Sequence, residues 1–308
     1  MITQSEDIIV LNDVTKDYGY KRGIFGESFS VKKGEAFGLV GENGAGKTTT
    51  LRNIMGFIRP DHGKITVEGK DAFLDAFEIK KVVGYVPGEI ALPQLKTGRD
   101  VLKSQMELLN IDDFSEADRL IKKLQLNIEA YPKRMSKGMK QKMAVVMALM
   151  SSPDILILDE PTTGLDPLMR EAFMKVLLEE KGKGRTILIS SNSYPELSLL
   201  CDKVALISQG HLMTVADNNA IQNRDEQDYK IEFLDHDNFA RFRNEWFRIT
   251  KVREDINQLT VEVRKKELTT LFQRLKLYQV KYLTQVPYTL ETYLDDFIKK
   301  EGEKNETK

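Results

Sequence analysis

The sequence predicts an α/β fold built on a mostly parallel sheet, followed by a small α+β domain. Strand-like and helix-like segments alternate over about residues 6–215. Several of the strand-like segments are apolar throughout, which is typical of strands buried on both faces of a parallel sheet. A glycine-rich segment, residues 41–48, also stands directly between a strand-like and a helix-like stretch. These observations favour strands joined by helical crossovers.

Six segments of the first part have the length and composition of buried strands. They are bounded by turn residues and rich in β-branched or other apolar side chains: 8–11, 36–40, 64–67, 155–158, 186–189 and 204–207. Apolar residues at helical spacing predict helices over 99–109, 116–126 and 139–150.

A change of composition marks the end of the first part. Residues 218–228 are polar and lack strand periodicity, so we expect a linker there. Beyond it, period-two and helical patterns each occur again, in a strand–helix order that appears twice. We therefore expect a small α+β domain over 229–300 and a flexible charged tail over 301–308.

Composition excludes several classes of protein. The chain has 308 residues, and 46 Lys and Arg against 47 Asp and Glu leave a net charge of −1, which excludes a generally basic nucleic-acid binder. One cysteine, Cys201, excludes an internal disulfide framework. No apolar run approaches the ~20 residues of a membrane-spanning helix, and the polar N-terminus is unlike a secretory signal. We expect a cytosolic protein whose membrane contact is made through a partner.

Residues 41–48 match the phosphate-binding loop pattern G-x-x-x-x-G-K-[ST]. A strand ends at Val40 and a helix follows, which favours a phosphate site over a glycine-rich turn that matches by chance. Lys47 is expected to reach the β- and γ-phosphates, and Thr48 to bind Mg²⁺. The predicted ATP-binding residues here are Gly41, Glu42, Asn43, Gly44, Ala45, Gly46, Lys47, Thr48 and Thr49.

Two carboxylates follow the apolar strand 155–158. Asp159 is predicted to hold Mg²⁺, and Glu160 to polarise the attacking water as the catalytic base. Acidic residues can also end any buried strand at a solvent-facing edge. Because the chain carries a phosphate loop as well, the metal and catalytic interpretation is the better one.

Two further segments point to one family. Residues 135–141 (Met-Ser-Lys-Gly-Met-Lys-Gln) and 161–167 (Pro-Thr-Thr-Gly-Leu-Asp-Pro) resemble the nucleotide-binding subunit of ATP-binding-cassette (ABC) transporters, a resemblance that covers about residues 6–215. It implies a P-loop NTPase cassette over residues 1–217 with an N-terminal antiparallel β subdomain. It also implies a helical signature subdomain at about 88–150.

The resemblance assigns further residues to the nucleotide site. Asp166 would lie at a dimer seam, and Tyr18 would stack on adenine, although Tyr18 also fits an ordinary half-buried aromatic. The signature, which would act on ATP held by a second subunit, comprises Ser136, Lys137, Gly138 and Met139. Ser136 is a good helix N-cap, and a helix N-terminus attracts anions. A solvated basic helix start is the other interpretation of this segment.

The sequence departs from the family in the signature, where Lys137 and Met139 replace the usual small and polar residues, and at the Q-loop and switch positions. Gly88 stands where the family usually has the Q-loop glutamine, and whether the neighbouring Glu89 replaces it stays open. Asn192 stands where the family usually has a switch histidine; its amide can donate to the γ-phosphate but cannot carry a positive charge. We include Asn192 among the catalytic residues and expect either slow hydrolysis or pairing with a different cassette that has the more regular motifs.

The predicted function is that of an ATP-binding and ATP-hydrolysing ABC transporter subunit with ATP and Mg²⁺ as ligands. By resemblance it powers export of a peptide, antibiotic or other amphiphile through a separate membrane permease. Its partners are that permease and a second cassette, and it is peripheral on the inner face of the cell membrane. The alternative is a non-transport or binding-only regulatory ABC ATPase with little turnover.

Overall fold

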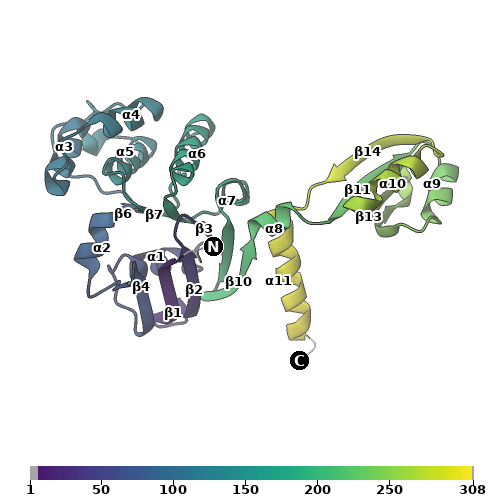
Figure 1. The fold of residues 1–308 in the computed structure, drawn as a ribbon, viewed down its shortest axis with the longest axis horizontal. Coiled ribbons are helices and arrows are strands. Elements are labelled where there is room, and N and C mark those ends of the chain that lie inside the picture. Colours follow the sequence, from purple (N-terminus) through teal and green to yellow (C-terminus); the bar gives the residue numbers. More distant parts are fainter. Residues whose placement is uncertain (1–5, 307–308) are drawn as a thin grey trace, which may run out of the picture. The chain divides into compact units, whose positions relative to one another are not determined.

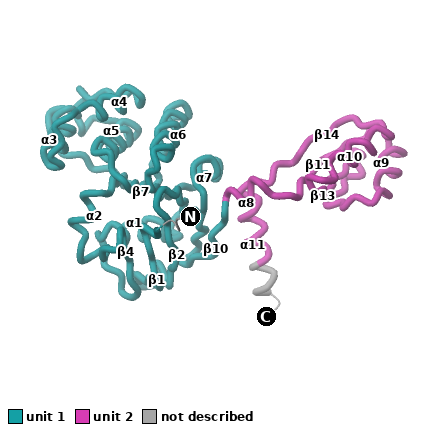
Figure 2. Tube along the Cα trace, in the orientation of Figure 1, with its two compact units in different colours: residues 1–217 teal, residues 218–308 magenta. Residues whose placement is uncertain are grey.

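The computed structural model describes residues 6–306, and the chain divides into two compact units, Met1–Asp217 and Asn218–Lys308 (Figure 2). Each unit has its own sheet or sheets and its own buried core. Within the described residues, no helix has both the length and the apolar character needed to cross a lipid bilayer.

Unit 1 begins with an antiparallel sheet in the strand order β2-β1-β4-β5 (Figure 1). Its strands are β1 (Asp7–Asp17), β2 (Gly23–Lys32), β4 (His62–Val67) and β5 (Lys70–Asp71). Along β2 every second side chain from Glu27 to Val31 is buried, as expected for a sheet with one covered face. The expected antiparallel subdomain is confirmed.

The second sheet of unit 1 has the order β10-β9-β3-β8-β7-β6, and all of its pairs are parallel except β9 with β10. Its strands are β3 (Ala36–Val40), β6 (Val83–Val86), β7 (Ile155–Asp159), β8 (Thr186–Ser190), β9 (Lys203–Ser208) and β10 (His211–Asp217). Every residue of β3, β7 and β8 is buried, which explains their apolar sequences without alternation. The predicted mostly parallel core is confirmed.

Seven α-helices belong to the described part of unit 1. They are α1 (Lys47–Ile54), α2 (Ala76–Val82), α3 (Gly98–Leu109), α4 (Ser115–Lys123), α5 (Lys137–Leu149), α6 (Pro167–Gly182) and α7 (Tyr194–Leu200). A 3-10 turn at Pro132–Arg134 precedes α5. Helices α3, α4 and α5 lie together in Figure 1 and form the predicted helical subdomain.

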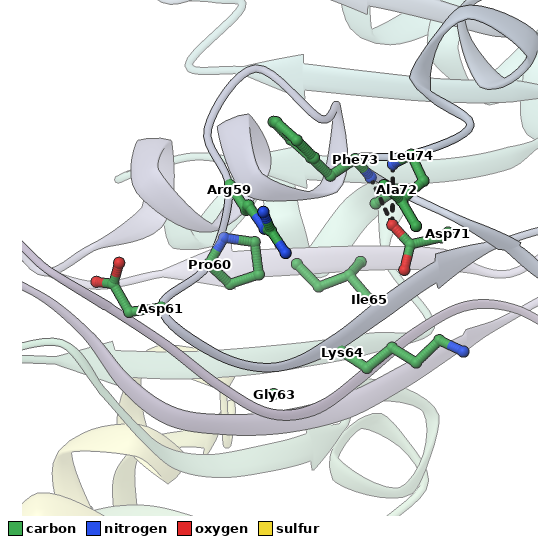
Figure 3. A pocket seen from close by; sticks show the side chains of 10 residues that line it. All are labelled: Arg59, Pro60, Asp61, Gly63, Lys64, Ile65, Asp71, Ala72, Phe73 and Leu74. Carbon is green, nitrogen blue, oxygen red and sulfur yellow. Dashed lines mark hydrogen bonds between the residues drawn. The ribbon is translucent and has the colours of Figure 1, made fainter.

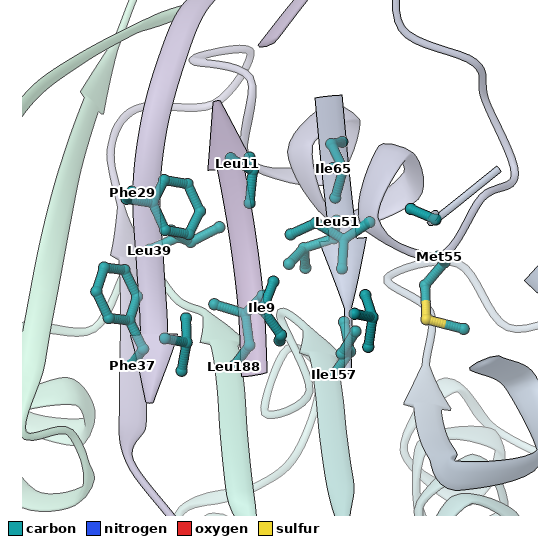
Figure 4. Packing of buried hydrophobic residues seen from close by; sticks show 14 of the residues in the cluster. Ile9, Leu11, Phe29, Phe37, Leu39, Leu51, Met55, Ile65, Ile157 and Leu188 are labelled. Atoms are coloured by element: carbon teal, nitrogen blue, oxygen red, sulfur yellow. The ribbon is translucent and has the colours of Figure 1, made fainter. Parts of the chain in front are cut away.

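The core of unit 1 holds helix α1 against strands of both sheets (Figure 4). Leu51 of α1 is buried with Ile9 of β1 and Ile157 of β7. Phe29 and Phe37 stack with ring centroids 5.2 Å apart and join the two sheets directly. Because α1 packs against strands of both sheets, its packing also positions the loop that precedes it.

Unit 2 is a β-α-β-β-α-β domain whose four strands pair antiparallel in the order β12-β13-β11-β14. The elements of unit 2 are α8 (Asn218–Gln222), β11 (Glu226–Phe233), α9 (His236–Arg243), β12 (Arg248–Arg253), 3-10 turns at Glu254–Ile256 and Lys265–Glu267, β13 (Gln258–Arg264), α10 (Leu268–Leu275), β14 (Val280–Val286) and α11 (Leu290–Glu306). The stretch predicted as a linker, 218–228, holds α8 and the start of β11. Helix α11 enters the stretch predicted as a tail, of which residues 307–308 lie outside the described residues.

A buried carboxyl group lies beneath α1. Glu27 of β2 is fully buried, and its Oε2 accepts a 2.8 Å hydrogen bond from the Thr50 hydroxyl. Its Oε1 has no hydrogen-bond partner among the described residues. Burial raises the pKa of Glu27 from 4.5 to about 7, against the smaller opposite effect of the Thr50 hydrogen bond.

Glu27→Gln should remove this titration while keeping the shape of the side chain. The folded state holds a proton between pH 4.5 and about 7 that the unfolded state has released, so wild-type stability falls as pH rises through this window. We therefore expect the free energy of unfolding of the Gln variant, relative to that of the wild type, to increase by roughly 3 kcal/mol between pH 5 and pH 8.5.

Hydrogen exchange of the β2 and α1 amides measures that free energy, with the exposed Glu68→Gln as the matched control. A difference between Glu27→Gln and wild type that does not change with pH would contradict a buried, titrating Glu27.

Candidate functional site

The glycine-rich loop joins β3 to α1 and closely follows the neighbouring chain. A Cβ atom on Gly41 would lie 2.1 Å from the Ile207 carbonyl oxygen, so only glycine fits there. Gly46 has a φ of 121° and is the N-cap of α1, where a side chain would also meet Ile24. The loop therefore depends on glycine for backbone conformation and for close packing, as a loop that wraps phosphate requires.

Lys47 is the central cation of the site and is only 4% exposed. Its Nζ donates to the carbonyl oxygens of Gly41 at 2.7 Å and Glu42 at 3.2 Å, and to Asn192 Oδ1 at 2.8 Å. The Glu160 carboxylate lies 3.7 Å away. Burial lowers the pKa of Lys47, and the neighbouring carboxylates act in the opposite direction. The ammonium group is thus held inside the loop that is predicted to bind phosphate.

Thr48 and Asp159 meet where a Mg²⁺ ion would be held. The Thr48 hydroxyl donates to Asp159 Oδ2 at 2.8 Å, and Ser190 at the end of β8 donates to Asp159 Oδ1 at 2.7 Å. A hydroxyl and a carboxylate beside a triphosphate site form the hard oxygen donor set that Mg²⁺ prefers. The residues present therefore fit the ion. Ser190 was not predicted from the sequence, because its only signal is its place at the end of a neighbouring buried strand.

Glu160 is held in an unusual backbone conformation. Its φ is 46°, in the left-handed region, and its N–H is directed to both the carbonyl and hydroxyl oxygens of Ser190, at 3.1 and 3.0 Å. Its Oε1 accepts from Asn192 Nδ2 at 3.3 Å, and its Oε2 from the Thr163 hydroxyl at 3.4 Å. The turn therefore directs this carboxylate towards Lys47.

Asn192 links three of the predicted residues. Besides accepting from Lys47 and donating to Glu160, its Nδ2 donates to Asn43 Oδ1 at 3.0 Å. The Ser193 N–H donates to the Ser191 hydroxyl at 3.0 Å and fixes the loop that carries the amide. Asn192 thus lies beside Lys47, as a contact with phosphate would require.

The Q-loop positions differ in what they approach. A Cβ atom on Gly88 would lie 3.1 Å from Asp159 Oδ2, so this glycine backbone borders the predicted metal ligand. Glu89 is exposed and makes no ion pair within the described part of the chain. In this structure, then, Glu89 makes no contact that would replace a Q-loop glutamine.

The signature residues lie together at the start of α5. The Ser136 hydroxyl caps the helix by accepting from the Met139 N–H at 3.2 Å. Lys137 and Gly138 pack against Gly164, and Asp166 caps α6 through the Met169 N–H at 3.0 Å. The structure gives no hydrogen bond or ion pair between residues 136–139 and 41–49. The described chain therefore contains two separate groups of predicted residues.

A cavity borders the phosphate loop at Gly44, and Tyr18 directly follows Asp17, one of the residues that line it. A cavity of about 840 Å³ is lined by Asp17, Lys21, Arg22, Gly23, Phe25, Gly44, Gln209 and His211. The rings of Phe25 and His211 lie 5.4 Å apart. Tyr18 is 49% exposed and follows the lining residue Asp17, with Lys16 Nζ 5.9 Å from its ring. Sequence reasoning missed Phe25 and His211 because they come from strands far apart in the chain.

A second cavity, of about 410 Å³, contains none of the predicted site residues (Figure 3). Arg59 and Phe73 both line this cavity, and the Arg59 guanidinium carbon lies 5.6 Å from the centroid of the Phe73 ring. The Asp71 carboxylate accepts from the backbone N–H groups of Phe73 and Leu74, both at 3.0 Å. This carboxylate organises the local turn, and we assign the cavity no catalytic part.

A buried phosphate-loop lysine, a threonine hydroxyl on a strand-end aspartate and an adjacent glutamate define a P-loop nucleotide-binding ATPase. A family model described as ABC transporter matches residues 25–163. The linearmycin resistance ATP-binding protein LnrL of Bacillus subtilis (strain 168) is 35% identical over 217 residues, 69% of this chain and 70% of that protein. The chain belongs to the family of ABC transporter ATP-binding proteins, and it is an ABC ATPase.

Two further similarities agree with this assignment. The bacitracin transport ATP-binding protein BcrA of Bacillus licheniformis is 32% identical over 247 residues, 79% of this chain and 80% of that protein. A solved structure described as an ATP binding subunit of an ABC transporter has a TM-score of 0.64 at 28% identity, covering 70% of this chain and 92% of that chain. The predicted family and cassette fold are therefore confirmed.

Asp159→Asn should weaken nucleotide binding only when Mg²⁺ is present. The variant keeps the shape of the side chain but loses the charge that would bind the ion, so we expect Mg²⁺-dependent ATP affinity to fall by about tenfold or more. Titration calorimetry in Mg²⁺ and in excess EDTA measures the two affinities.

Asp154→Asn, an exposed position just before β7, is the matched control and should bind like the wild type. An equal loss of affinity for Asp159→Asn in EDTA would show that Asp159 acts without the metal.

Proposed function

We propose that this chain hydrolyses ATP to power export of a peptide, antibiotic or other amphiphile through a separate membrane permease. The names of two relatives support the cargo class, since one is described by linearmycin resistance and the other by bacitracin transport. The observation that carries the ATPase part is the network in which Lys47, Asn192 and Glu160 meet over the glycine-rich loop.

The chain's own residues divide the chemistry between them. Loop N–H groups and the α1 N-terminus bind phosphate oxygens, and the Lys47 ammonium balances their charge. Glu160 orients a water molecule and takes up its proton as the water attacks the γ-phosphorus; the bond from the γ-phosphorus to the bridging oxygen breaks, and ADP leaves with that oxygen. Thr48 and Asp159 would hold Mg²⁺, which would neutralise charge on the β- and γ-phosphates. Asn192 supplies an uncharged donor for the γ-phosphate.

The signature supports a two-cassette unit. ABC cassettes dimerise and pair with membrane permeases. Ser136 and Gly138 lie at a helix N-terminus, which favours an anion, yet neither is bonded to the chain's own phosphate loop. We infer that they complete the site of a second cassette, so that ATP bridges both and favours the closed pair. All residues of this mechanism lie within residues 1–217, which we propose as the nucleotide-binding domain.

The permease contact is proposed for a cavity of about 230 Å³ lined in part by Phe57, Lys80, Tyr85 and Met147. Phe57 is 46% exposed, with Lys80 Nζ 4.8 Å from its ring, so the rim offers an aromatic surface beside a cation. A cassette held there would be peripheral on the inner face of the cell membrane.

A second candidate is a non-transport or binding-only regulatory ABC ATPase with little turnover. Gly88 and Asn192 favour it, because neither supplies the side chain that the family usually has at these positions. Co-purification with a polytopic membrane protein would support transport. Association with ribosomes or DNA, without a membrane partner, would contradict the transport function.

Glu160→Gln should separate binding from hydrolysis. Loss of the general base should lower the ATPase rate by about 10²–10⁴-fold, while ATP still binds. Steady-state phosphate release and ATP titration measure the two properties. Sedimentation of the same variant with ATP should show a dimer that ADP does not support. Hydrolysis at the wild-type rate would remove Glu160 from the mechanism.

Asn192→His tests the proposed slow turnover. A histidine can donate to the γ-phosphate and also carry positive charge, so we expect the ATPase rate to rise several-fold, about the effect of one charge-assisted hydrogen bond. The rate of wild type and variant is compared at saturating MgATP. A fast wild type that is unchanged by the substitution would contradict an impaired switch.

A further inference from the structure

Two asparagine side chains meet across the phosphate loop. Asn43 belongs to the loop itself, whereas Asn192 follows β8 and lies 149 positions later in the chain. Asn192 Nδ2 donates to Asn43 Oδ1 at 3.0 Å, and the same amide contacts Lys47 and Glu160. This pair lies directly beside the cation that is predicted to reach the γ-phosphate.

The orientation of the Asn192 amide is set by its charged neighbours. A lysine ammonium only donates, so the Asn192 oxygen faces Lys47 at 2.8 Å. An ionised carboxylate only accepts, so Nδ2 faces Glu160 at 3.3 Å. Among the hydrogen-bond partners of this amide, only Asn43 can exchange the roles of donor and acceptor.

A γ-phosphate would need a hydrogen-bond donor from Asn192, whereas Lys47 needs an acceptor. Phosphate oxygens are acceptors and draw Lys47 towards themselves, which leaves the Asn192 oxygen without its donor and facing other acceptors. Rotation of the amide by about 180° turns Nδ2 towards the phosphate and breaks its bond to Glu160. The rotated oxygen then needs a donor, which Asn43 Nδ2 supplies once its own amide rotates.

We propose that Asn192 and Asn43 form a two-amide relay that distinguishes a nucleoside triphosphate from a diphosphate and releases Glu160 only for the triphosphate. This inference rests on the proposed function, since it deepens the role of the same site. Asn43 is a positioning residue here, because it acts through Asn192. A diphosphate leaves both amides in the orientation seen in this structure.

The relay predicts an asymmetric effect of Asn43→Ala. With ADP, Asn192 Nδ2 keeps Glu160 as its partner, so the variant should lose less affinity for ADP than for a triphosphate. With a non-hydrolysed ATP analogue, the rotated Asn192 oxygen has lost its donor, so affinity should fall about fivefold, the effect of one neutral hydrogen bond. The readout is the dissociation constant for ADP divided by that for the ATP analogue, measured by calorimetry in Mg²⁺. We expect this ratio to fall in the variant.

A double-mutant cycle separates the relay from a general loss of loop structure. Asn43→Ala should have no further effect on the ratio in the Asn192→Ala background, because it acts only through that amide. The exposed Asn223→Ala in unit 2 is the matched control and should leave the ratio unchanged.

Three outcomes would overturn the relay. One is an unchanged ratio in Asn43→Ala, and another is a ratio that falls equally with and without Asn192. Failure of the wild type to bind either nucleotide is the third, and it alone also contradicts the proposed function.

Discussion

The buried ammonium group of Lys47 is the interaction on which the rest of the site depends. Removing a cation from water is unfavourable unless oxygen atoms surround it. Here Gly41 and Glu42 supply carbonyl oxygens, Asn192 supplies an amide oxygen, and Glu160 supplies nearby negative charge. Phosphate oxygens can take the place of these partners, so the loop has the charge and donor directions that a triphosphate needs.

The parallel sheet explains how distant residues reach this cation. The carboxyl ends of β3, β7 and β8 meet at one edge, so Thr48 contacts Asp159 across 111 positions and Lys47 contacts Asn192 across 145. The signature at Ser136 starts a helix of a different subdomain and is not bonded to that edge. This separation is the basis of our proposal that the signature completes the site of a second cassette.

Much of the fold followed from patterns whose physical cause is local or periodic. Strands buried on both faces have no polar alternation, and β3, β7 and β8 were predicted on that basis. The buried Glu27 could not be predicted, because a glutamate in a strand normally faces water and its partner Thr50 lies on α1, which contacts β2 only in the folded chain. Helix α8 in the polar stretch 218–228 was equally hidden, since this stretch has no apolar periodicity of its own.

The sequence by itself determined the chemical groups of the site: the glycines and Lys47 of the loop, the carboxylates after β7, and Ser136 at a helix start. Each has a local signal, because a tight turn, a strand end or a helix cap restricts which residue types fit. Only the tertiary structure decided that Ser190 binds Asp159 and that Asn192 contacts Asn43. Such contacts depend on strand order and loop positions, which place side chains in hydrogen-bond range irrespective of their distance along the chain.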